Sequence, residues 1–171
     1  MAKGYTARMM QMAMIEELEG LFKDKKFNGQ QSKKSLKVFK QNLPIDDGND
    51  EDADTDAAAS PYIVVILGEG SIKDPDSPQI VSVMLTICCY DEGKEREGYE
   101  DVQNIIEDIL QHFCVSPQFG AAFEVMRETD HEMQWAIQQD DTYPYYFGAV
   151  LLDVTVPAMT GDQNKNWGDM I

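Results

Sequence analysis

The sequence has few cysteines, only two histidines and no long apolar run. Cys88, Cys89 and Cys114 are odd in number and lack CxxC spacing, which argues against a disulfide framework or a zinc site, so we expect buried free thiols. No apolar stretch approaches the roughly 18 residues that cross a bilayer, and no signal-peptide core is present. We therefore expect a soluble protein that is made in a reducing cytoplasm and has no membrane partner.

Motifs of the common enzyme classes are also missing. The sequence contains no GxSxG, GxxxxGK[ST], GxGxxG or HExxH motif. Neither His112 nor His131 has a matching serine or cysteine motif. We expect no catalytic residue, no cofactor and no bound metal. The alternative is a metallonuclease that uses paired acids such as Asp140-Asp141, but such pairs arise by chance among 31 acidic residues.

Basic residues are scarce beyond the N-terminal quarter of the chain. Residues 1–45 hold nine of the fourteen Lys and Arg against four acids, a net charge of +5, whereas residues 46–171 have a net charge of −22. Seven acids and no base lie between Asp46 and Asp56. Such a surface repels phosphate backbones, so stable nucleic-acid binding by the body of the protein is not expected. Residues 23–40, rich in lysine, are interpreted as a solvated sheet edge, with a phosphate-contacting patch as the alternative.

Apolar periodicity predicts an α+β fold. Helical spacing predicts an N-terminal helix over 6–22 and a long helix over about 99–114. These helices are expected to pack on a mainly antiparallel sheet of about five strands. Residues 62–67 and 79–90 are expected to form one hairpin, and weaker strands at 122–127 and 133–137 a second. Further strands are predicted at 35–43 and 145–156.

The chain is expected to form a single domain over residues 1–157. The acidic residues 46–60 have the composition of a loop within it. Residues 158–171 show no periodicity, which predicts a C-terminal tail that is flexible or docks on a neighbour through Trp167.

Three stretches carry a resemblance to a known family. They are Pro61–Leu67 (PYIVVIL), Val81–Phe113 with its segment YEDVQNII, and Trp135 together with Pro144–Gly148 (PYYFG) before a strand that stops at Val156-Pro157. Over residues 35–157 the chain resembles the tail terminator, or tail-completion, proteins of long-tailed bacteriophages and related prophages. The Asp run and the C-terminal tail depart from the family pattern.

The resemblance implies a non-enzymatic protein whose copies close into a ring, usually of six, on the head-proximal end of the tail tube. There the ring ends tube polymerisation and offers a docking face to the neck, so the partners are the tail tube protein and a neck or head-completion protein. The location would be the tail–neck junction of the virion, after assembly in the host cytoplasm, with DNA passing through unbound. The alternatives are another head–tail joining protein or an acidic regulatory, DNA-mimicking protein.

Two sets of residues are candidates for this function. Five of the ten methionines lie among the first fourteen residues, and their flexible side chains suit either a core or a subunit contact. Acidic residues are expected to face or guard a channel through which DNA slides. The candidate interface residues are Met10, Met14, Trp135, Tyr145, Tyr146 and Trp167. The candidate channel residues are Asp50, Glu51, Asp52 and Asp54.

Overall fold

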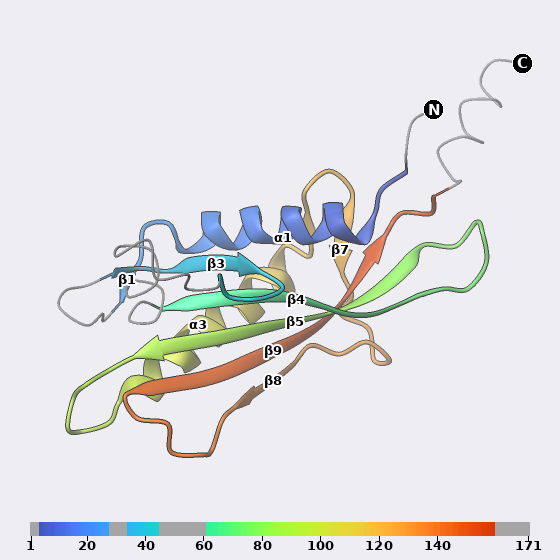
Figure 1. Cartoon of the computed structure of the whole chain (residues 1–171). Coiled ribbons are helices and arrows are strands. Elements are labelled where there is room, and N and C mark those ends of the chain that lie inside the picture. Colours follow the sequence, from blue (N-terminus) through green and yellow to red (C-terminus); the bar gives the residue numbers. More distant parts are fainter. Residues whose placement is uncertain (1–3, 28–33, 45–60, 160–171) are drawn as a thin grey trace, which may run out of the picture.

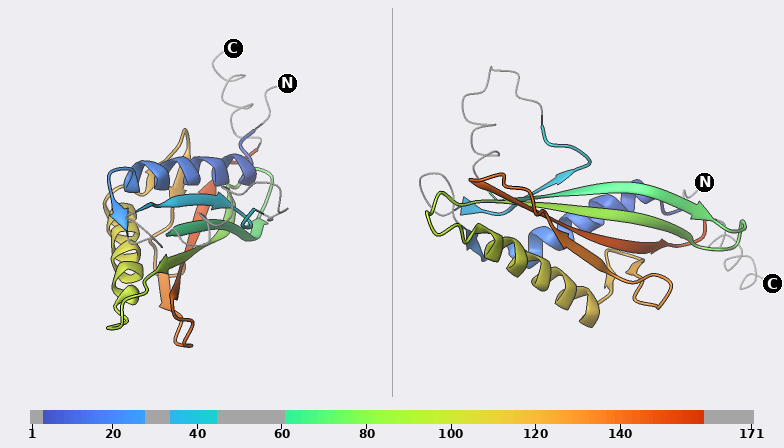
Figure 2. Two further views of the ribbon diagram at one scale, coloured as in Figure 1. Left: turned by 60° about the vertical axis from the view of Figure 1, so that its left-hand side comes forward. Right: turned by 90° about the horizontal axis from the view of Figure 1, so that it is seen from below.

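The computed structural model describes residues 4–27, 34–44 and 61–159 and has an α+β fold (Figure 1). Helices α1 (Ala7–Phe22) and α3 (Gly98–Val115) enclose one core with a curved, mixed sheet of seven strands (Figure 2). The acidic residues Asp50, Glu51, Asp52 and Asp54 and the aromatic residue Trp167 lie outside the described residues. The channel and tail expectations therefore stay predictions.

Three long strands form the centre of the sheet. Strand β5 (Gln79–Tyr90) pairs antiparallel with β4 (Tyr62–Ile72) on one side and with β9 (Tyr145–Val156) on the other. The short strand β3 (Lys37–Lys40) extends the sheet by pairing parallel with β4. The remaining short strands are β1 (Lys26–Phe27), β2 (Lys34–Ser35), β6 (Gln118–Phe119), β7 (Phe123–Val125) and β8 (Gln134–Ile137).

The composition of the core follows from the period of two residues in the strands and of about 3.6 residues in the helices. Alternate residues of β5 and β9, such as Leu85 and Val150, are buried because successive strand side chains point to opposite faces. Helix α3 adds an apolar stripe, and its first turn carries Glu100 and Asp101 at the positive end of the helix dipole. Thr6 caps α1 by accepting a hydrogen bond from the Met9 N–H at 3.2 Å.

The structure confirms some of the predicted elements and corrects others. Strands β5 and β9 have the predicted bounds, β4 and β5 are antiparallel neighbours, and α3 matches its predicted range within one residue at each end. The predicted hairpin between 122–127 and 133–137 is wrong, because β7 and β8 both pair with β9 and not with each other. Among the described residues the sheet has seven strands where about five were predicted, since the twelve-residue β9 is long enough to pair with both short strands.

The N-terminal part of the sheet also differs from the prediction. The single strand predicted over 35–43 is divided into β2 and β3, which belong to different sheets. β2 pairs with β1 in a two-stranded sheet, whereas β3 joins the main sheet and ends before Gln41, whose φ of 63° breaks the strand.

Candidate interaction surface

Met10 and Met14 are core residues. Both are fully buried, because residues four apart in a helix lie on one face and this face of α1 packs against the sheet and α3. The interpretation of these two residues as a subunit interface is therefore wrong. The exposed methionines of α1 are Met9 and Met12, whose exposed fractions are 46% and 42%.

Six of the seven tyrosines lie at one end of the molecule, which we call the tyrosine end. β5 ends there and β9 begins there (Figure 1). The register places Tyr90 opposite Tyr145, with ring centroids 5.3 Å apart. The start of β4 lies in the same place, since Tyr62 pairs with Cys88. The tyrosine end comprises Tyr62, Tyr90, Tyr99, Tyr143, Tyr145 and Tyr146.

Polar contacts hold together the two loops of the tyrosine end, which are residues 91–97 and 138–144. The Tyr143 hydroxyl donates to the Glu92 carbonyl oxygen at 2.6 Å, and the Tyr90 hydroxyl donates to the Glu92 carboxylate, which raises the pKa of Tyr90 to about 12. The Arg96 guanidinium lies 5.6 Å from the Tyr143 ring centroid. Arg96 also forms an ion pair with Asp141. The pKa of Asp141 is lowered mainly by a hydrogen bond from the Tyr143 backbone N–H and, to a smaller extent, by Arg96.

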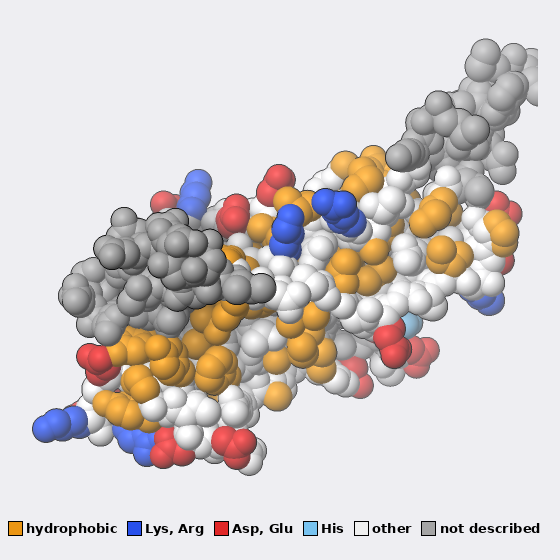
Figure 3. Space-filling model, in the orientation of Figure 1, with side chains coloured by type: hydrophobic (Ala, Val, Ile, Leu, Met, Phe, Trp, Pro, Cys, Tyr) orange, Lys and Arg blue, Asp and Glu red, His pale blue; other side chains and the backbone are white. Residues whose placement is uncertain are grey.

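This arrangement presents aromatic side chains on an ordered frame. Tyr99 and Tyr143 are 49% and 45% exposed, and Tyr145 and Tyr146 are partly exposed. Figure 3 shows hydrophobic side chains, a class that includes tyrosine there, gathered over the end of the sheet where β5 meets β9. Tyrosine combines a large apolar body with a polar tip and is enriched in protein interfaces. Partly exposed tyrosines of this kind are typical of contact surfaces.

The edge strand β8 is a second element that exposes an aromatic side chain. Among the described residues it pairs only with β9, and Trp135 at its middle is 48% exposed. Residues 133–139 contain no charge, whereas β3 at the opposite side of the sheet begins and ends with a lysine. Natural edge strands usually carry charges that discourage pairing with other chains. Their lack in β8 favours a role in protein contact.

The polar side chains near β8 are not arranged as a nucleophile and base. His131 Nδ1 lies 2.8 Å from Asp153 Oδ2, but the Ser82 hydroxyl donates to Oδ1 of the same carboxylate at 3.0 Å and not to the imidazole. His112 Nε2 lies 2.7 Å from Glu17 Oε1 and so links α3 to α1. Both histidines connect segments that are distant in sequence.

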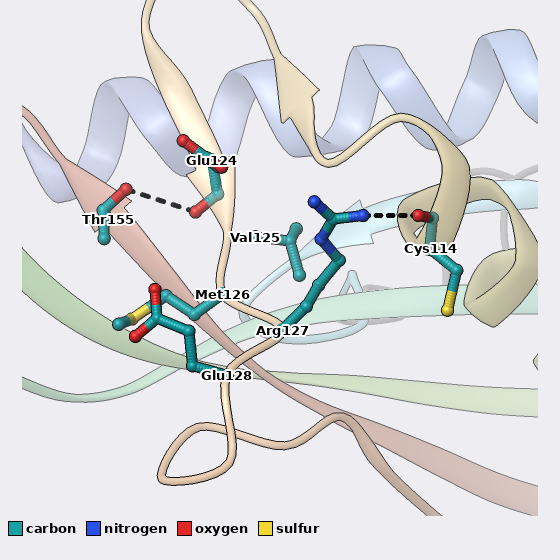
Figure 4. Close-up of a pocket in the computed structure, with 7 residues that line it drawn as sticks. All are labelled: Cys114, Glu124, Val125, Met126, Arg127, Glu128 and Thr155. Carbon is teal, nitrogen blue, oxygen red and sulfur yellow. Dashed lines mark hydrogen bonds between the residues drawn. The ribbon is translucent and has the colours of Figure 1, made fainter.

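A cavity of about 530 Å³ is lined by Arg127 and by Cys114, whose side chain is exposed (Figure 4). Arg127 donates a hydrogen bond to the Cys114 carbonyl oxygen, and Figure 4 shows the thiol pointing away from the guanidinium. The other two thiols are buried, and burial raises the pKa of Cys88 to about 11 and also raises the pKa of Cys89. Within 4–27, 34–44 and 61–159, no three His, Cys, Asp or Glu side chains are placed to hold a metal ion.

The structure thus places three of the predicted interface residues at least partly at the surface. Tyr145 and Tyr146 lie at the tyrosine end, and Trp135 lies on the neighbouring edge strand. Sequence reasoning missed the exposed Tyr99 and Tyr143 as surface residues. The run from Tyr143 to Phe147 was a usable signal for the second of these, because Tyr143 extends the aromatic run beyond the strand that begins at Tyr145.

Comparison of the sequence with known protein families gives no match, and comparison with curated proteins gives none either. No helix within the described residues combines the length and apolar character that crossing a bilayer requires.

Proposed function

We propose that this chain is a structural virion protein that forms a ring on the head-proximal end of a phage tail tube. In this role it ends tube polymerisation and provides the docking face for the neck, as in the tail terminator proteins that its sequence resembles. The observation that carries the proposal is the contact surface, in which the tyrosine end and the uncharged edge of β8 expose aromatic side chains on an ordered frame. Homo-oligomer interfaces use such residues.

The positions of the resembling segments support the proposal. Pro61–Leu67, Val81–Phe113 and Pro144–Val156 are separate in sequence, yet they form the adjoining elements β4, β5, α3 and β9. The resemblance therefore covers one packed unit that includes most of the tyrosine end. The overall charge of −17 agrees with a ring that lets DNA pass without holding its phosphates.

A capping assay tests this function. Tail tube protein is allowed to polymerise with and without the chain, and tube lengths and ends are measured by electron microscopy. We expect shorter tubes with one additional ring at a single end, because a terminator occupies the growing end. Unchanged tube lengths and bare ends would contradict the proposal. Rings that form without capping tubes would favour another head–tail joining protein.

A further inference from the structure

Two segments of opposite charge lie at opposite edges of the sheet. Residues 34–44, which we call the basic edge, contain three lysines and no acid, a net charge of +3. Residues 128–141, the acidic edge, contain five acids and no lysine or arginine, a net charge of −5. Both edges lie within the described residues.

The fold separates these two edges. The basic edge contains β3 at one end of the strand order, and the acidic edge contains β8, which flanks β9. Strands β4, β5 and β9 lie between them, so at about 4.8 Å per strand the two edges are about 19 Å apart. Figure 1 shows them on the upper and lower sides of the sheet. One chain thus carries two complementary surfaces that it cannot bring together itself.

Charged side chains on both edges are available for contact. Lys37 and Lys40 on the basic edge and Glu132 and Asp140 on the acidic edge are exposed, and none of the four forms an ion pair with another described residue. Other charges nearby are already paired, such as Lys25 with Asp108. Within the part of the chain that the structure describes, these four charges are therefore available to attract an opposite surface.

We propose that the basic edge of one copy docks on the acidic edge of the next copy, with Trp135 on β8 at the centre of the contact. This proposal rests on the proposed ring. The occupant is a second copy because a chain with a net charge of −17 repels its own copies except where its basic edge approaches. Two copies facing each other through β8 would bring their acidic flanks together, which is unfavourable.

The resulting contact is head to tail. Such heterologous contacts close into rings when the rotation between subunits closes, whereas a symmetric contact stops at a dimer. The charges steer the two edges together, and the uncharged stretch 133–139 then allows Trp135 and the free edge of β8 to pack without burying an unpaired charge.

Paired charge reversals test the proposal. Lys37→Glu with Lys40→Glu alters only the basic edge, and Glu132→Lys with Asp140→Lys alters only the acidic edge. We expect each double variant to keep the far-UV circular dichroism spectrum and the cooperative unfolding of the unaltered chain but to lose association by about tenfold or more in low-salt buffer. An equimolar mixture of the two variants should regain association, because each retains one original edge. Glu16→Lys with Glu19→Lys on exposed positions of α1 is the matched control and should assemble normally.

The outcomes separate this proposal from the ring itself. If the unaltered chain assembles but both edge variants assemble equally well, the ring stands and the edge assignment fails. The assignment also fails if two non-associating variants do not recover when they are mixed. A monomeric unaltered chain would overturn both proposals. Sedimentation velocity measures the mass of each variant and of their mixture in the same buffer.

Discussion

Tyr146 on strand β9 packs its ring directly on Gly98, the first residue of helix α3. A Cβ added at Gly98 would overlap the ring carbons of Tyr146 and lie 2.9 Å from Cβ of Asp91. The missing side chain therefore allows α3 to begin against the sheet. The next residue, Tyr99, is held by this contact at the tyrosine end.

Gly98→Ala should lower the free energy of unfolding by about 1–3 kcal/mol, because the added methyl group forces Tyr146 or the start of α3 to move. Urea unfolding measures the change. Gly20→Ala is the matched control, since a Cβ at Gly20 meets no atom within 4 Å and the position lies within α1. The control should stabilise the protein by about 0.5–1 kcal/mol. Equal effects of the two substitutions would contradict the packing described.

The methionines of α1 should divide into two groups by unfolding free energy. Met10→Ala and Met14→Ala should each cost about 2–5 kcal/mol, because both side chains are fully buried and each leaves a cavity. Met9→Ala and Met12→Ala should change stability by about 0.5 kcal/mol or less, as exposed sites do. Guanidinium unfolding of the four variants checks this. A large loss of stability in Met9→Ala or Met12→Ala would show that a different face of α1 packs against the core.

Sequence periodicity predicted the long strands because their alternation is sustained. Strand β5 alternates from Val81 to Cys89, so its bounds and its buried face could be assigned. The pairing of β7 and β8 could not be predicted, because strands of three and four residues carry little pattern and their partner β9 lies far along the chain. The parallel pairing of β3 with β4 has no local signature either.

Long-range contacts also limited prediction of the surface. Tyr99 and Tyr143 come together with Arg96 only because α3 begins beside the loop that precedes β9. Gln11 lies in the apolar stripe of α1 and is buried. Its side-chain amide donates to the Val65 carbonyl oxygen at 2.8 Å, a partner 54 residues away that the sequence does not reveal.

The three thiols should react at different rates. At pH 8 a thiol reagent should modify Cys114 rapidly, because it is exposed, and Cys88 and Cys89 slowly, because both are buried and their pKa values are raised. Absorbance with an aromatic disulfide reagent follows the reaction. Cys114→Ser should remove the fast phase, and unfolding should release two further equivalents. Three equal fast equivalents in the folded protein would contradict the assigned burial.

Stability should fall in alkaline solution. Burial raises the pKa of the Cys88 thiol to about 11 and raises the pKa of Tyr62 well above its ordinary value, so the fold holds both groups neutral. The unfolded chain ionises them at lower pH. The stability that comes from keeping these two groups neutral is therefore fully present below the ordinary thiol pKa. It is lost as the pH rises toward about 11, because the unfolded chain ionises more readily than the folded chain. Urea midpoints from pH 7 to pH 10.5 should show this decline, and Cys88→Ala should reduce its slope. A flat profile would contradict the prediction.

The most direct test of the ring is the mass of the protein in solution, measured by light scattering over a range of concentrations, with and without tail tube protein. A ring of six copies of the 19.3-kDa chain would have a mass of about 116 kDa. We expect a discrete closed species of this order, formed alone or in the presence of tube protein. A mass of 19.3 kDa under every condition, with no association with tubes, would contradict the central claim.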